Sequence, residues 1–426
     1  MYIEPVQKND ENAKLIMEWR NDEKTREMSF NQNIKTLDFF KEEFYNNYFS
    51  NTIHPLFAIL DNNKIGIVSF VDDKEKKELI ININIASEYR GKKLGCTIIK
   101  NAIEFIKDNY KIKSNIIAHI KEKNIPSIKT FEKVGFIFFE KYIKNNEIVL
   151  EYKYQMLSLK IGNNIISNDS QAYIIAELSA NHNQNLENAR QLVKEAAKCG
   201  ANAIKLQTYT PDTITLNCKK DYFKIKGTLW ENQYLYELYD KAYTPWEWHN
   251  ELKEEANRLG MDLFSSPFDV TAVDFLESLD FPAYKIASCE ITDHILIKRI
   301  AQTGKPVIIS SGMASKEELK EAVDLLRKNG CNQICMLKCT SSYPAKPEDA
   351  NLITMKDMAE SFNVITGLSD HTLGIEVPIA SIALGSKVIE KHFTLLRGSG
   401  SPDDAFSLTP EEFKRMVDSV RIVEKS

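Results

Sequence analysis

The chain has 426 residues, of which 43% are hydrophobic and 27% are charged, and its formal net charge is −5. This length predicts two globular domains, and the absence of a basic excess argues against nucleic acid as a partner. The polar start of the sequence and the lack of a run of about 20 apolar residues argue against secretion and membrane insertion, so we expect a cytoplasmic protein.

Residues 1–156 are expected to form a mixed α/β domain. The apolar segments Leu56–Leu60 and Ile65–Val71 flank a polar turn, which is typical of a β-hairpin. Apolar residues then recur at helical spacing after Gly95, and a shorter helical pattern ends at Gly135.

The segment YRGKKLG (Tyr89 to Gly95) lies between a predicted strand and a predicted helix, where backbone N–H groups and the helix dipole attract anions. It resembles the pyrophosphate loop of the GNAT acetyltransferases, with Lys93 in place of the first glycine of that pattern. The resemblance implies that acetyl-CoA is the acetyl donor and that it is bound by Ile85, Arg90, Gly91, Lys92, Lys93, Leu94, Gly95 and Asn124.

Two further features bear on what the GNAT-like domain does. The opening MEWRNDEKTREM is similar to amino-sugar N-acetyltransferases, which implies transfer to the 4-amino group of a UDP-linked 4-amino sugar. Phe131, however, stands where many GNAT enzymes have a tyrosine general acid, and phenylalanine cannot protonate a thiolate. An inactive acetyl-CoA-binding module is therefore the alternative.

Residues 157–170 are polar and are expected to be a linker, and residues 171–426 show a strict alternation of strands and helices. Eight strand–helix units in this length predict a (β/α)₈ TIM barrel. The predicted strands are Tyr173–Leu178, Ala203–Gln207, Asp262–Ser266, Ala283–Ile286, Val307–Ser310, Ile334–Lys338, Val364–Leu368 and Val388–His392. An aromatic-rich insert at 208–243 is longer than an ordinary connection, which favours a lid.

Polar residues cluster at the ends of the predicted barrel strands, where TIM barrels carry their chemistry. Lys205, Lys285 and several Ser and Thr hydroxyls suit a small anion such as a phosphorylated carboxylate. His371 and His392 end adjacent strands, and two imidazoles beside carboxylates suit a divalent metal with open coordination positions. The alternative is a pair of histidines that only make hydrogen bonds.

Nine segments in chain order resemble the sialic-acid synthase family: AELSANHNQ, AIKLQTY, TPWEWH, YKIASCEI, SSGMAS, KCTSSYP, GLSDHTLG, EKHFT and SPDDAFSL. Within it they are most similar to the members that make pseudaminic acid. This implies condensation of phosphoenolpyruvate with 2,4-diacetamido-2,4,6-trideoxy-L-altrose. Synthesis of sialic or legionaminic acid is the alternative within the family.

The same resemblance implies roles for individual residues. His371 and His392 are expected to hold Mn²⁺, or Mg²⁺ or Co²⁺. The expected phosphoenolpyruvate ligands are Lys205, Lys285, Ser288, Ser310, Ser341 and Ser369, and the expected sugar ligands are Gln207, Tyr343 and Asp403. Glu177, Lys205, Lys285, Glu290, His371, His392 and Asp403 form the expected catalytic set.

The resemblance also implies a homodimer formed through the barrel. Family members usually continue into a small antifreeze-like domain, and we expect none in this chain, whose sequence ends at Ser426 after the eighth helix. Two other functions compete with the synthase. One is a non-catalytic acetyl-CoA sensor on an assembly barrel. The other is an aldolase that forms a Schiff base on Lys285.

Overall fold

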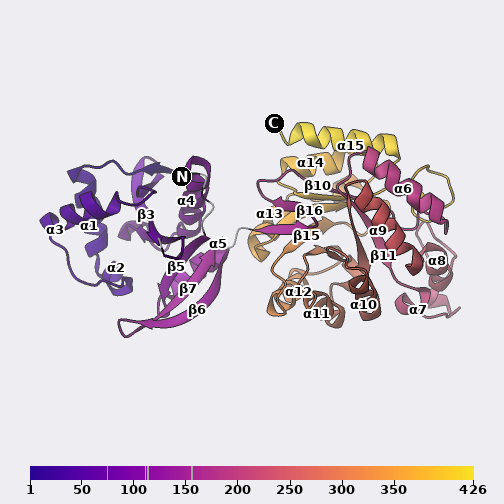
Figure 1. The fold of residues 1–426 in the computed structure, drawn as a ribbon, viewed down its shortest axis with the longest axis horizontal. Coiled ribbons are helices and arrows are strands. Elements are labelled where there is room, and N and C mark those ends of the chain that lie inside the picture. Colours follow the sequence, from indigo (N-terminus) through magenta and orange to yellow (C-terminus); the bar gives the residue numbers. More distant parts are fainter. Residues whose placement is uncertain (74, 111, 113–114, 155–156) are drawn as a thin grey trace. The chain divides into compact units, whose positions relative to one another are not determined.

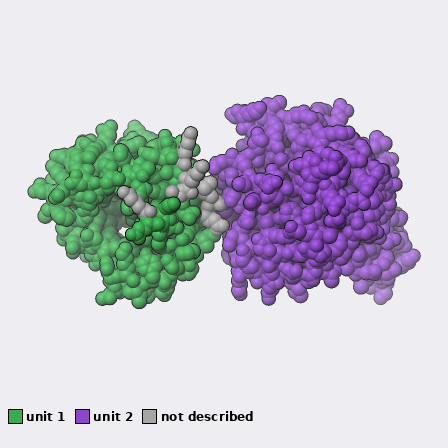
Figure 2. Space-filling model, viewed as in Figure 1, with its two compact units in different colours: residues 1–156 green, residues 157–426 purple. Residues whose placement is uncertain are grey.

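A computed structural model describes residues 1–73, 75–110, 112, 115–154 and 157–426. The chain divides into two compact units, residues 1–156 and residues 157–426, and each is treated by itself (Figures 1 and 2). Residue 156, where we placed the end of the first domain, lies outside the described residues. None of the described helices combines the length and the apolarity that crossing a bilayer requires.

Unit 1 is built on a seven-stranded sheet in the order β1-β2-β3-β4-β5-β7-β6. Only β4 and β5 pair in parallel; the other neighbours are antiparallel. Its strands are β1 (Tyr2–Pro5), β2 (Leu56–Leu60), β3 (Asn63–Asp73), β4 (Glu78–Ile85), β5 (Asn115–Lys121), β6 (Phe136–Lys144) and β7 (Glu147–Tyr154). Its helices are α1 (Asp10–Asn21), α2 (Glu23–Met28), α3 (Leu37–Glu43), α4 (Gly95–Tyr110) and α5 (Ile125–Val134). The predicted hairpin and the predicted mixed α/β class are confirmed.

Unit 2 contains a closed barrel of eight parallel strands, which confirms the predicted fold. The strands are β10 (Tyr173–Glu177), β11 (Ala203–Thr208), β12 (Asp262–Pro267), β13 (Tyr284–Ile286), β14 (Val307–Ser310), β15 (Ile334–Cys339), β16 (Ile365–Asp370) and β17 (Val388–His392). The barrel closes through β10 and β17, with Glu177 opposite His392.

Helices connect the barrel strands and cover them (Figure 1). They are α6 (Leu186–Lys198), α7 (Pro211–Ile214), α8 (Leu235–Ala242), α9 (His249–Arg258), α10 (Val270–Ser278), α11 (His294–Ala301), α12 (Lys316–Lys328), α13 (Thr354–Phe362), α14 (Glu376–Ala383) and α15 (Pro410–Val423). Local sequence sets their starts. Ser315 and Glu318 form a reciprocal capping box at α12, and Thr409 and Glu412 do the same at α15.

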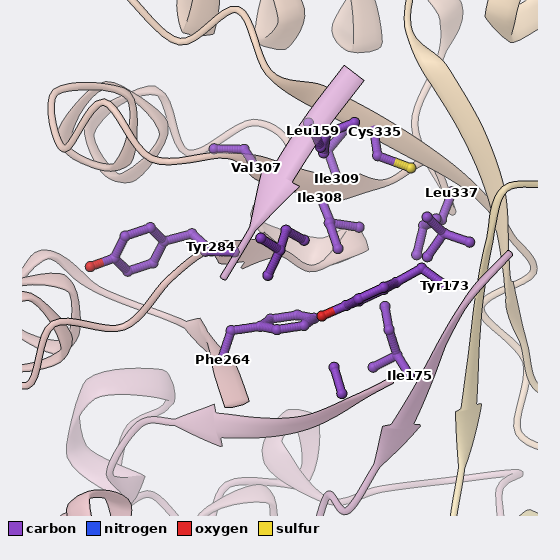
Figure 3. Packing of buried hydrophobic residues seen from close by; sticks show 14 of the residues in the cluster. Leu159, Tyr173, Ile175, Phe264, Tyr284, Val307, Ile308, Ile309, Cys335 and Leu337 are labelled. Atoms are coloured by element: carbon purple, nitrogen blue, oxygen red, sulfur yellow. The ribbon is translucent and has the colours of Figure 1, made fainter. Parts of the chain in front are cut away.

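The expectation of a linker at 157–170 is wrong. This segment belongs to unit 2 and folds into a hairpin of β8 (Ser158–Ile161) and β9 (Asn164–Ser167). Leu159, Ile161 and Ile166 alternate with more exposed residues and are buried in the barrel core, where β8 contacts β15. Side chains of this core, among them Leu159, are drawn together in Figure 3.

Candidate active site

The candidate site lies at the carboxyl ends of the barrel strands. Side chains alternate along a strand, so Glu390 and His392 of β17 share one face and Lys391 has the other. Lys391 is fully buried on the outer face and bonds Asp370 Oδ2 at 2.5 Å. At the end of β17, Glu390 and His392 therefore belong to the candidate site, whereas Lys391 has a structural role.

A buried network of four charged side chains forms the floor of the site. Lys205 Nζ lies 3.0 Å from Glu177 Oε2 and 2.7 Å from Glu390 Oε1. Lys285 Nζ donates to Ser310 Oγ at 2.6 Å and lies 3.8 Å from the same Glu390 oxygen. Ser369 Oγ also donates to that oxygen, at 3.2 Å. Two ammonium groups therefore converge on one carboxylate.

Burial sets the charge states of this network. Burial opposes the negative charge of Glu390, but Lys205 and Lys285 overcome it and lower the pKa of this carboxyl to about 2. Burial raises the pKa of Glu177 and lowers the pKa of Lys285. Glu390 is therefore the carboxylate of this network that stays charged.

The two predicted metal-binding histidines lie together, with ring centroids 5.3 Å apart. The Nδ1 atom of His371 is 3.0 Å from the carbonyl oxygen of Thr340, which leaves Nε2 of this ring for another ligand. The Nδ1 atom of His392 is buried without a hydrogen-bond partner and lies 3.9 Å from Asp403 Oδ2. An orphaned buried nitrogen beside a carboxylate fits a metal site.

The donor set limits the kind of metal site. Among the described residues, no group of three or more His, Cys, Asp or Glu side chains is arranged to hold an ion. A divalent ion here would have His371 and His392 as its protein ligands and would keep the remaining coordination positions for water or substrate. Open coordination positions are a feature of catalytic metal sites, whereas structural sites are closed.

The predicted sugar ligands lie on the same side as the histidines. Ser179 Oγ donates to Asp403 Oδ2, and Gln207 Nε2 donates to Ser179 Oγ at 3.1 Å and to Glu177 Oε1 at 3.0 Å. The ring centroid of Tyr343 lies 4.3 Å from that of His371. Asp403 and Tyr343 thus lie beside the histidine pair, and Gln207 is linked to Asp403 through Ser179; that they bind a sugar stays a prediction.

The aromatic insert at 208–243 reaches the site. Trp230 Nε1 donates to the carbonyl oxygen of Pro402 at 2.9 Å, and its ring lies 6.1 Å from that of Tyr343. Pro402 directly precedes Asp403. The insert therefore covers residues that belong to the site, which supports its predicted role as a lid.

The other predicted phosphoenolpyruvate ligands surround Gly312. Its backbone N–H donates to Ser288 Oγ at 3.1 Å. A Cβ atom at Gly312 would lie 2.2 Å from Ser341 Oγ and 2.7 Å from Ser288 Oγ, so a side chain there would require both serines to move. The Oε2 atom of Glu290 is buried without a hydrogen bond, and burial raises the pKa of this carboxyl to about 7, against the lowering effect of the charges of Lys285 and Lys205.

Some residues of the site were missed by sequence reasoning. Glu390 was not among the predicted site residues, although its position two residues before His392 on a strand places it inside the barrel. Phe406, whose ring lies 4.9 Å from that of His392, and Ser179 were also missed. They come from loops whose paths only the tertiary structure defines.

Unit 1 contains the predicted acetyl-CoA loop. Lys93 has φ +60°, a left-handed conformation that glycine, the residue of the GNAT pattern at this position, adopts freely. Helix α4 begins two residues later, at Gly95. The guanidinium group of Arg90 makes its hydrogen bonds within unit 1. It donates to Asp22 Oδ1 at 2.5 Å, to Thr25 Oγ1 at 2.7 Å and to the carbonyl oxygen of Ile85 at 2.9 Å.

Two more predicted positions of this domain have structural roles. Asn124 Oδ1 accepts from the backbone N–H of Ser127 and caps α5. Phe131 is buried and packs edge-to-face on Phe136, with ring centroids 4.8 Å apart. Burial in the core explains how a phenylalanine is accommodated at this position, and it leaves no proton donor there.

Comparison with known proteins agrees with this geometry. A family model described as "NeuB family" matches residues 192–426. The chain belongs to the NeuB family. A second model, "Acetyltransferase (GNAT) domain", matches residues 1–137. The chain is therefore an enzyme that joins a NeuB-family barrel to a GNAT acetyltransferase domain, a domain type that implies acetyl-CoA as its ligand.

Relatives of the NeuB-family barrel share a large fraction of identical residues with this chain. Pseudaminic acid synthase of Helicobacter pylori is 51% identical over 248 residues, covering 58% of this chain and 73% of the relative. Pseudaminic acid synthase of Campylobacter jejuni (serotype O:2) is 48% identical, covering 63% and 78%. The solved N-acetylneuraminic acid synthetase of Leptospira borgpetersenii superimposes with a TM-score of 0.57 at 31% identity, covering 63% of this chain and 89% of the other.

Proposed function

We propose that the barrel condenses phosphoenolpyruvate with 2,4-diacetamido-2,4,6-trideoxy-L-altrose to give pseudaminic acid and phosphate. The observation that carries the chemistry is the pair of buried lysines at Glu390, which lies two residues before His392 on β17. The choice of sugar rests on similarity. Relatives named pseudaminic acid synthase are 51% and 48% identical, whereas the N,N'-diacetyllegionaminic acid synthases of Campylobacter jejuni and Legionella pneumophila are 38% and 39% identical.

In this proposal the floor of the site binds phosphoenolpyruvate. Lys205 and Lys285 neutralise its charges, because an ammonium in a buried site is a strong partner for phosphate and carboxylate. The hydroxyls of Ser288, Ser310, Ser341 and Ser369 supply further hydrogen bonds. Fixed donors of this kind need no reorganisation during the reaction, which is the main source of their catalytic effect.

The upper part of the site binds the open-chain sugar. A divalent ion held by His371 and His392 would supply Lewis acidity toward the aldehyde. Among the divalent ions we favour Mn²⁺. Asp403, fixed by Ser179, and Gln207 orient the sugar, and the ring of Tyr343 covers it. Carbon 3 of phosphoenolpyruvate attacks the aldehyde carbon, water adds to carbon 2, and phosphate leaves. Glu177, Glu290 and Asp403 are the carboxyls available to accept the proton of that water.

Phosphate release from phosphoenolpyruvate tests this proposal. The full chain is assayed with Mn²⁺ and either 2,4-diacetamido-2,4,6-trideoxy-L-altrose or N-acetylmannosamine. Release with the altrose sugar alone is the expected result. Release with N-acetylmannosamine would assign a sialic acid synthase instead, and release with neither sugar would contradict both assignments.

We further propose that unit 1 transfers the acetyl group of acetyl-CoA to the 4-amino group of a UDP-linked 4-amino sugar. Support comes from the GNAT match and from the loop at residues 90–95, whose left-handed Lys93 keeps the glycine-like turn. The burial of Phe131 favours the alternative of a binding module without turnover. Release of free thiol from acetyl-CoA in the presence of the sugar separates the two.

A further inference from the structure

One face of the unit 1 sheet carries polar side chains that have no role in the acetyl-CoA loop. Along β5, Ile116, Ala118 and Ile120 pack into the core that α4 completes. Because side chains alternate, His119 and Lys121 lie on the opposite face. Glu151 of β7 pairs directly with His119 across the sheet, so both side chains lie on that face.

This face borders a gap in the sheet. Strands β4 and β5 pair only between Glu78–Ile80 and Asn115–Ile117, although β4 continues to Ile85 and β5 to Lys121. Beyond the paired part the two strands separate, toward the end where the loop at residues 90–95 follows β4. His119 lies in the separated part of β5. A ligand that extends from the loop into this gap reaches the level of His119.

Helix α2 forms the other wall of the same region. Lys121 Nζ donates to the carbonyl oxygen of Glu27 at 3.1 Å, and Thr25 Oγ1 lies 3.3 Å from Asn84 Oδ1 of β4. The region between helix and strands is therefore bounded by α2, β4 and β5. Figure 2 shows a hollow in unit 1, in the part of the view where Figure 1 has α2 next to β5.

His119 and Glu151 form an oriented pair at this wall. His119 Nε2 lies 3.3 Å from Glu151 Oε2, so a neutral ring donates through Nε2 and keeps the lone pair of Nδ1. The His119 side chain is 17% exposed, whereas that of Glu151 is 1% exposed. The Oε1 atom of Glu151 is buried without a hydrogen bond. A buried carboxylate thus holds an imidazole that solvent or a ligand can reach.

The groups around His119 keep its ring neutral near pH 7. Burial lowers the pKa of His119, the charges of Lys144 and Lys76 lower it further, and Glu151 opposes them only in part. The ring of Tyr142 lies perpendicular to the imidazole, with the two ring centroids 6.0 Å apart. Lys76 Nζ and Lys153 Nζ lie 3.8 Å and 3.6 Å from the oxygens of Glu151. A neutral imidazole is the form that accepts a proton.

We propose that His119, oriented by Glu151, is the catalytic base of acetyl transfer and that the acceptor amine binds in the region bounded by α2, β4 and β5. This inference rests on the acetyltransferase function proposed above, and it adds the residue that activates the acceptor. Amino groups of sugars are largely protonated at neutral pH, and an ammonium has no lone pair with which to attack a thioester.

The transfer balances with the groups present. His119 Nδ1 takes one proton from the acceptor ammonium, and the free amine attacks the thioester carbonyl. The new C–N bond forms, the C–S bond breaks, and the CoA thiolate takes the second proton of the nitrogen. Because Phe131 cannot donate a proton, the thiolate depends on that second proton. His119 then releases its own proton to solvent.

The test compares His119→Asn with the full wild-type chain, using acetyl-CoA and the UDP-linked 4-amino sugar and measuring thiol release against pH. We expect kcat to fall about 100-fold near neutral pH, since a positioned base contributes at least that much. The loss should shrink as pH rises toward the pKa of the amine itself, because the amine then needs no base. His54→Asn, at an exposed histidine of the same unit, is the matched control.

A second variant separates catalysis from folding. Glu151→Gln removes the carboxylate that raises the pKa of His119, so the acid limb of the kcat profile should move to lower pH. Calorimetric binding of acetyl-CoA should stay within about threefold in His119→Asn if unit 1 remains folded. Wild-type rates in His119→Asn, or an unmoved acid limb in Glu151→Gln, would overturn the inference and leave the acetyl transfer standing. A wild-type chain that releases no thiol would overturn the acetyl transfer and this inference with it.

Discussion

Glu390 Oε1 and Lys205 Nζ lie 2.7 Å apart in the floor of the barrel, where both side chains are buried. The same oxygen lies 3.8 Å from Lys285 Nζ. A buried cation without a partner of opposite charge is costly. Glu390 provides this partner for both lysines.

Glu390→Gln should therefore destabilise the barrel. Lys285 would lose its nearest carboxylate, and removing one partner of a buried pair costs about 3 kcal/mol or more. Phosphoenolpyruvate should restore part of this loss, because its negative charges replace the missing one. Urea unfolding with and without phosphoenolpyruvate measures both effects. Glu360→Gln, at an exposed position on α13, is the control, and equal stability of the two variants would contradict this account.

The histidine pair predicts where a divalent ion binds. His371→Asn and His392→Asn should each abolish Mn²⁺ binding in a calorimetric titration. Each should also lower the rate of phosphate release by at least about 100-fold, because losing an electrostatic or Lewis-acid contribution to the transition state has an effect of this size. His294→Asn changes an exposed histidine of α11 and should leave both quantities unchanged. Near-normal Mn²⁺ affinity in either site variant would refute the ligand assignment.

The sequence predicts the barrel well because its elements depend on local patterns. Strands such as Val307–Ser310 and Val388–His392 occupy the predicted residues, since buried apolar runs between helices mark them. The site residues at strand ends follow from the fold class, because every parallel strand of a barrel delivers its end to one face. Lys205, Lys285, His371 and His392 are brought together for that reason.

Tertiary partners explain what the sequence could not predict. The hairpin at 158–167 mixes polar and apolar residues, and its three buried apolar side chains become significant only once the barrel core is known. The pairing of His119 with Glu151 joins residues that are 32 positions apart, and only the register of β5 and β7 reveals it.

Glu290 predicts a dependence of barrel stability on pH. Burial raises its pKa to about 7 from 4.5, so between these values the folded barrel holds a proton that the unfolded chain has released. The contribution of Glu290 to stability is therefore lost as pH rises through this window, by roughly 3 kcal/mol at most. Glu290→Gln removes this titration and should gain stability relative to wild type between about pH 5 and about pH 8.

Comparing unfolding free energies of the two proteins at each pH cancels the titrations that they share. Glu317→Gln, in the exposed first turn of α12, is the control variant. A pH-independent difference for Glu290→Gln would mean that Glu290 is ionised in the folded barrel throughout this range.

The hairpin of β8 and β9 predicts a stability effect at residues that the sequence assigned to a linker. Leu159 is fully buried in the barrel core, whereas Ile165 on the same hairpin is 63% exposed. Leu159→Ala should lower the free energy of unfolding by about 3 kcal/mol, the usual cost of a cavity in a core, and Ile165→Ala should change it by less than about 0.5 kcal/mol. Urea unfolding, monitored with a spectroscopic probe in the barrel, measures the change in unfolding free energy of both variants. Equal effects of the two variants would mean that the hairpin does not contribute to the core, because only a packed leucine leaves a cavity when it is shortened.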